Sequence, residues 1–170
     1  TTAAAFLRAG HRLLTDDLLA IRANPDGTLE ILPAYGQLKL AEEAADAMQL
    51  AEAQPLPLVY PGFSKRQHRL MGDFRHDQLQ PERLYVLDRV GDQPGLTRLA
   101  GTQALSAILR YSYITRFGKA ALSPADEARH MQGCAALARC VQVATLHVPH
   151  ALNRLEETVE LVRADCEDHR

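Results

Sequence analysis

Segments typical of strands alternate with segments typical of helices along this chain of 170 residues. Residues 84–90 (LYVLDRV) and 141–148 (VQVATLHV) are short apolar runs rich in β-branched residues, as expected of strands. The segments that follow them, 102–116 and 151–168, carry the spacing of helices. Because a sheet covered by helices buries the apolar face of both kinds of element, this pattern predicts an α/β fold.

The front of the chain predicts a helix followed by a β-hairpin, because the turn signal Asn24-Pro-Asp-Gly27 separates two strand-like segments. The proline-rich passage 54–70 favours a loop or an edge segment, since proline donates no ladder hydrogen bond. The other expected elements are a helix over 2–9, strands over 12–15, 18–23 and 28–32, a helix over 41–50, a strand over 96–100 that returns after 84–90, and a helix from Ser123-Pro124 to about Cys140.

Composition excludes several classes of protein. The formal net charge of −2 provides no global field that would attract nucleic acid. No apolar run approaches the roughly 18 residues of a membrane span, so we expect no membrane contact. The three cysteines form no C-x-x-C pair and are odd in number, which predicts reduced thiols and a cytoplasmic location. The length suits one domain, and a homo-oligomer is among the assemblies left open.

Two adjacent carboxylates, Asp16 and Asp17, stand between the apolar pairs Leu13–Leu14 and Leu18–Leu19. If this stretch is extended, the two acids point to opposite faces of a sheet. At least one then needs a cation, a metal or a water-filled site, because burying a bare carboxylate is costly. Three interpretations are open: a short helix that begins at Thr15 or Asp16, a surface β-turn, and an acidic strand end that holds a cation.

The stretch from Arg8 to Ile21, R-A-G-H-R-L-L-T-D-D-L-L-A-I, follows a small-residue helix. It resembles the segment after the phosphate loop in the HPr kinase/phosphorylase family and its HPr-kinase-like relatives. Residues 33–48, 83–90 and 130–150 are more loosely similar to later segments of that family. The resemblance implies one catalytic domain over residues 1–170. Its α/β core would be P-loop kinase-like, of the HPr kinase and phosphoenolpyruvate carboxykinase type, with β-hairpins near the front and without the first strand and phosphate loop.

The same resemblance implies transfer of phosphate from ATP, with Mg²⁺, to a serine hydroxyl of a protein, a peptide or a small molecule. Asp16 would act as catalytic base, and Asp17, beside Asp16, would help to hold Mg²⁺. Thr1 and Thr2 would directly follow the Gly-Lys-Ser/Thr of a phosphate loop, which would lie immediately upstream. The Arg-Gly-Leu-Gly signature of true HPr kinases does not appear, so the kinase-like relatives, whose acceptors vary, fit better than HPr kinase itself.

Three further residues are candidates for binding the nucleotide. His11 is expected beside the strand that carries the acids, where it would orient a carboxylate or meet phosphate. Lys65 and Arg66 stand in a basic stretch, K-R-Q-H-R, whose side chains suit phosphate. A structural histidine and a solvated loop are the respective alternatives.

A second function from a different class is a non-catalytic nucleotide-binding or regulatory module that retains the fold. The reading frame upstream of Thr1 discriminates between the two. A G-x-x-x-x-G-K-[ST] motif that ends within a residue or two of Thr1 favours the enzyme, and its absence favours the module.

Overall fold

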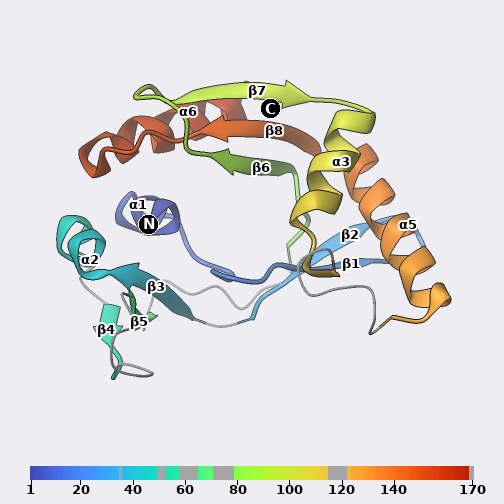
Figure 1. The fold of residues 1–170 in the computed structure, drawn as a ribbon, viewed down its shortest axis with the longest axis horizontal. Coiled ribbons are helices and arrows are strands. Elements are labelled where there is room, and N and C mark those ends of the chain that lie inside the picture. Colours follow the sequence, from blue (N-terminus) through green and yellow to red (C-terminus); the bar gives the residue numbers. More distant parts are fainter. Residues whose placement is uncertain (35, 50–52, 58–64, 71–78, 115–121, 169–170) are drawn as a thin grey trace.

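The computed structural model describes residues 1–170 except 35, 50–52, 58–64, 71–78, 115–121 and 169–170. In this part of the chain the fold is mixed α/β, with small sheets and surrounding helices (Figure 1). The elements in chain order are α1 (Thr2–Arg8), β1 (Ala20–Ala23), β2 (Leu29–Leu32), β3 (Gln37–Ala41), α2 (Glu42–Met48), β4 (Ala53–Pro55), β5 (Lys65–Leu70), β6 (Arg83–Asp88), β7 (Gly95–Leu99), α3 (Thr102–Tyr111), α5 (Pro124–Cys140), β8 (Gln142–His147), the 3-10 turn η2 (Leu152–Arg154) and α6 (Leu155–Glu167).

The sheet β6-β8-β7 has its last strand in the middle. β6 runs parallel to β8, with Arg83 opposite Gln142, and β7 runs antiparallel to β8. Both apolar runs are therefore strands, as predicted. The strand expected over 96–100 forms as β7 and runs antiparallel to β6, but the two strands do not pair directly because β8 lies between them. β8 has the most buried side chains of the three strands, as expected for the strand at the centre of a sheet that is covered by helices.

The main core surrounds α1, which lies between the sheet that contains β6 and the sheet that contains β3 (Figure 1). The small residues Ala4 and Ala5 are buried and let the neighbouring elements approach closely. Leu146 of β8 and the apolar face of α6 close the core from one side, and β3 and α2 from the other. Its members from those elements are Leu38, Leu40, Ala44, Met48, Leu146, Leu155, Val159 and Val162.

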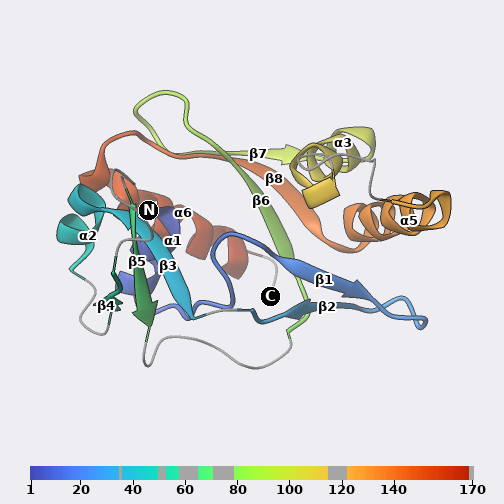
Figure 2. The same cartoon turned by 60° about the horizontal axis from the view of Figure 1, so that its bottom comes forward.

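A second core joins α3 and α5 to the β1-β2 hairpin and to the sheet β6-β8-β7, at the end where β8 begins. The start of α5 is as predicted: Ser123 is the N-cap, its Oγ accepts a hydrogen bond from the backbone N–H of Asp126 at 3.2 Å, and Pro124 occupies the first turn. In Figure 2 the hairpin reaches toward α5, whereas β3, β4 and β5 lie beside α2. Among the described helices, none is long and apolar enough to cross a membrane.

The sheet β3-β5-β4 corrects the reading of the proline-rich passage. Lys65–Leu70 is neither a loop nor an edge but the central strand, paired with β3 on one side and β4 on the other. The prolines all precede it, so nothing in these six residues interrupts a ladder. Pro55 does lie on the edge strand β4, as proline requires.

The β1-β2 hairpin forms at the predicted turn, where Gly27 has a φ of +86° that glycine adopts without strain. Its first strand, Ala20–Ala23, is shorter than the expected 18–23. The strand expected over 12–15 does not form. Leu13 alone takes part in an isolated bridge, because the polar side chains after it bond to another part of the chain.

Asp165 anchors α6 to the sheet from a buried position. Its Oδ2 accepts hydrogen bonds from Arg83 Nε at 3.0 Å and from Tyr85 Oη at 2.5 Å, and Arg98 pairs with Oδ1. Burial alone would raise the pKa of Asp165, but the Tyr85 hydrogen bond and the charges of Arg98 and Arg83 hold it below its usual value. Burial and the bond to Asp165 raise the pKa of Tyr85. The carboxylate is therefore ionised in the folded protein near neutral pH.

Candidate functional site

Asp16 and Asp17 lie in the irregular loop between α1 and β1, and both are exposed. A single residue of β3 holds them. The backbone N–H of Lys39 donates to Asp16 Oδ2 at 2.9 Å, and the Lys39 ammonium forms an ion pair with Asp17. Thr15 Oγ1 donates to the carbonyl oxygen of Leu18 at 2.6 Å and turns the chain around the pair. Because the stretch is not extended, both acids reach the same cation-bearing residue.

Thr1 lies close enough to three charged groups for each to act on its amino group. Burial lowers the pKa of that amino group, the Asp16 carboxylate opposes the shift, and the Arg89 and Lys65 cations add to it. Arg89 directly follows β6 and Lys65 begins β5, so charged groups far apart in sequence lie within electrostatic range of the start of α1. Among the described residues, no hydrogen bond or ion pair joins the predicted site residues Thr1, Asp16 and Lys65 to one another.

Lys65 and Arg66 do not serve the same place, because adjacent strand residues point to opposite faces of a sheet. Arg66 stands opposite Leu40 of β3 and turns to the face covered by α2, where its guanidinium lies 3.9 Å from Glu42. Lys65 stands opposite Ala41, two positions from Lys39 on the other face. The expected basic cluster is thus divided between two surfaces.

His11 lies beyond the far end of α1 from Thr1. Its Nε2 accepts a hydrogen bond from Arg163 Nε at 3.0 Å, and its ring packs edge-on against Phe6 with 5.4 Å between centroids. An accepting Nε2 leaves the ring proton on Nδ1. Thr2 is buried within α1. The structure therefore does not bring these two residues to the acids in the way it brings Thr1.

Lys39 and Arg89 were not predicted from the sequence as residues near the acids. The signal for Lys39 was present, because it stands between two apolar residues, Leu38 and Leu40, in a strand-like alternation that puts Lys39 on the opposite face from both. Arg89 carried no comparable signal. Its proximity to Thr1 depends on where β6 ends relative to α1, which is a property of the whole fold.

A polar cluster at the carboxyl ends of β6 and β8 also went unpredicted. His147 Nδ1 lies 3.5 Å from Asp88 Oδ2, and His147 Nε2 lies 3.2 Å from Thr97 Oγ1. These three strands place the side chains in register on one face of the sheet. The cluster fixes the imidazole between a carboxylate and a hydroxyl.

Asp16 and Asp17 suit a Mg²⁺ ion that is bound together with a nucleotide better than one held by protein side chains alone. Nowhere in the described residues do three or more histidine, cysteine or acidic side chains gather in a way that could hold a metal by themselves. Mg²⁺ bound to a nucleotide needs only one or two carboxylates, because phosphates and water complete its shell. No described residue donates a hydrogen bond to Asp16 Oδ1, so that oxygen is available, whereas Asp17 would have to exchange Lys39 for the metal.

Comparisons with known proteins add no assignment to this geometry. No protein-family model matches the chain, and neither a curated protein nor a solved structure matches it.

Proposed function

We propose that this chain is an ATP-dependent serine kinase-like domain with a P-loop kinase-like core, and that Asp16 and Asp17 carry its chemistry. The observation that supports the proposal is that the Asp16 carboxylate and the Lys65 and Arg89 cations all lie within electrostatic range of Thr1, where α1 begins. Phosphoryl transfer needs cations to neutralise the phosphates and a carboxylate to orient the attacking hydroxyl. Both kinds of group stand here on separate segments: the carboxylate on the loop between α1 and β1, and the cations on β5 and directly after β6.

Each acid has a distinct role in this proposal. Asp16 would accept the proton of the serine hydroxyl through Oδ1 while the serine oxygen bonds to the γ-phosphorus of ATP, the bond from that phosphorus to the bridging oxygen breaks, and ADP leaves. Asp17 would be the main ligand of Mg²⁺ and Asp16 a minor one, and the metal would supply neutralisation of phosphate charge when bound. Lys39 and Lys65 would stabilise the charge of the phosphates, and the Asp17–Lys39 pair would open as the metal binds.

The alternative is a nucleotide-binding or regulatory module without catalysis. One contact favours it: Lys39 already satisfies both acids, one through its backbone and one through its ammonium. In that case the pair is a clamp between the loop and β3. The upstream reading frame is the first test, and a G-x-x-x-x-G-K-[ST] motif that ends within a residue or two of Thr1 supports the kinase.

The chain of 170 residues, tested alone, should bind ATP·Mg²⁺ weakly or not at all, because the phosphate loop supplies the backbone N–H groups that cradle the phosphates. Isothermal calorimetry measures this directly. A micromolar dissociation constant would show that the described residues suffice for binding and that the dependence on a phosphate loop is wrong.

Substitution of the acids tests the roles in a polypeptide that carries the motif. Asp16→Asn should leave ATP affinity nearly unchanged and lower turnover by about 10² to 10⁴-fold, because the amide cannot accept the proton. Asp17→Asn should instead raise the Mg²⁺ concentration needed for ATP binding. Asp168→Asn, an exposed acid at the end of α6, is the matched control. Both site variants losing stability, with unchanged kinetics and metal dependence, would assign the pair to a structural clamp.

A further inference from the structure

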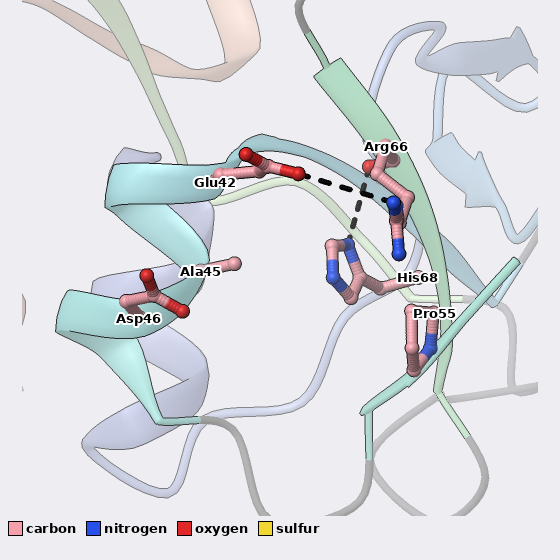
Figure 3. A pocket seen from close by; sticks show the side chains of 6 residues that line it. All are labelled: Glu42, Ala45, Asp46, Pro55, Arg66 and His68. Atoms are coloured by element: carbon pink, nitrogen blue, oxygen red, sulfur yellow. Dashed lines mark hydrogen bonds and ion pairs between the residues drawn. The ribbon is translucent and has the colours of Figure 1, made fainter. Parts of the chain in front are cut away.

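A shallow hollow of about 270 Å³ lies between α2 and the strands β4 and β5 (Figure 3). It opens on the face of β5 opposite to Lys65, so it is separate from the acids discussed above. Charged side chains dominate its wall. The lining residues are Glu42, Ala45, Asp46, Pro55, Arg66 and His68.

Arg66 brings to this hollow a guanidinium that is paired with Glu42 only at long range and that keeps one donor without a partner in the described part of the chain. Its Nε is shielded from solvent and has no acceptor among the described residues. The nearest carboxylate, Glu42, is 3.9 Å from Nη2, which is longer than a hydrogen bond. A shielded donor without an acceptor destabilises the protein, and a guanidinium is shaped to donate two parallel bonds to a carboxylate. The wall therefore offers a place for a planar anionic group.

His68 brings an unused acceptor. Its ring is buried, with only 8% of the residue exposed, and Nδ1 lies 3.2 Å from the carbonyl oxygen of Arg66. Because a carbonyl oxygen only accepts, Nδ1 carries the proton and Nε2 keeps its lone pair. In Figure 3 that second nitrogen faces α2, from which Asp46 points toward the hollow. The carboxylates of α2 thus lie across the hollow from Arg66 and His68 of β5.

We infer that this hollow binds a small zwitterion, a free α-amino acid, with its carboxylate on Arg66 and its ammonium group among Asp46, Glu42 and His68 Nε2. A simple anion would meet two carboxylates, and a simple cation would meet the guanidinium. A ligand with both charges a few ångströms apart matches the guanidinium and the carboxylates at the same time. The volume is close to that of the smallest ligand pockets, which suits a ligand of amino-acid size.

Titration of the purified chain with L-alanine, followed by two-dimensional ¹H–¹⁵N NMR, tests the inference. L-alanine should shift the signals of residues around Arg66 and His68 with a dissociation constant of about 1 mM. Propionate, which lacks the ammonium group, and ethylamine, which lacks the carboxylate, should each bind at least about tenfold more weakly. This experiment needs neither ATP nor a phosphate loop, so its result is independent of the proposed kinase activity.

Two substitutions assign the binding to the hollow. Arg66→Met removes the donors and keeps an apolar stem, and Asp46→Asn removes one charge from an exposed helix position. Each should weaken L-alanine binding at least about tenfold, and Asp46→Asn keeps the test valid if Arg66→Met fails to fold. The matched controls are Arg69→Met, on the other face of β5, and Glu43→Gln, the next acid of α2. Both controls should bind L-alanine as the unaltered chain does.

Three outcomes would overturn the inference. The first is the absence of any shift at about 20 mM L-alanine, far above the expected dissociation constant. The second is propionate binding as tightly as L-alanine, which would make the hollow an anion site. The third is unchanged affinity for L-alanine in both Arg66→Met and Asp46→Asn.

Discussion

Removing the charge of Asp165 should destabilise this protein more than any other single change of a charged side chain described above. In Asp165→Asn the side chain keeps its shape, but Arg83, whose side chain is only 8% exposed, loses its counterion. Arg98 is 44% exposed, so its pair contributes only about 0–1 kcal/mol. The loss is dominated by the buried charge left unpaired, and we expect the free energy of unfolding to fall by about 3–5 kcal/mol.

Equilibrium unfolding in urea, followed by circular dichroism, measures this change. Tyr85→Phe removes one hydrogen bond to the same carboxylate and should cost about 1.5–3 kcal/mol. The control is Glu157→Gln on the same helix as Asp165, which removes an exposed partner of Arg154 and should change stability much less. Because domains typically have a total stability of about 5–15 kcal/mol, Asp165→Asn should remain folded enough for its free energy of unfolding to be measured.

Acid should remove this stabilisation. The folded pKa of Asp165 lies below its unfolded value, so the carboxylate contributes fully above about pH 5 and progressively less as the pH falls through the folded pKa. The difference in stability between the unaltered chain and Asp165→Asn should therefore shrink on acidification. A loss below about 1 kcal/mol at pH 7, comparable to that of an exposed pair, would refute the view that Asp165 is a buried anchor.

Two further predictions concern α5. Ser123→Ala should lower stability by about 1 kcal/mol through loss of the N-cap, which thermal unfolding measures. The same change should raise the pKa of Asp126, because the Ser123 hydrogen bond is the main cause of its low value, and NMR titration of the carboxyl group measures this. Cys140 is exposed, whereas burial raises the pKa of the Cys134 thiol, so iodoacetamide at pH 8 should alkylate Cys140 first, as peptide mass spectrometry would show. Equal rates at both thiols, or an unchanged pKa of Asp126, would contradict these assignments.

Features encoded in a few neighbouring residues could be predicted from the sequence. The start of α5 is an example, because Ser123 and Pro124 act on the first turn alone. The strand over 142–147 was predictable for a similar reason, since its apolar run is short and ends at a proline. The proline content of residues 54–70 hides the strand Lys65–Leu70, because all the prolines of this passage precede the six residues that form the strand.

The arrangement of the site depends on contacts that no local pattern encodes. The need of the acidic pair for a cation followed from its composition, but its partner, Lys39, lies 23 residues beyond Asp16 on a strand that the hairpin separates from the loop. The division of Lys65 from Arg66 likewise required knowing that their segment is a strand. Nothing near Arg89 in the sequence indicates its proximity to Thr1.

The position of β8 has a consequence for how the protein folds. The residues of β6 and β7 all precede residue 100, but these two strands do not pair with each other. Each pairs with β8, which lies at 142–147. The chain must therefore lose the entropy of closing a long loop before the hydrogen bonds of either ladder can form, and this slows folding. Until then both strands present open backbone edges to other chains. A polypeptide that ends before residue 142 should consequently aggregate, even though most of the molecule is present.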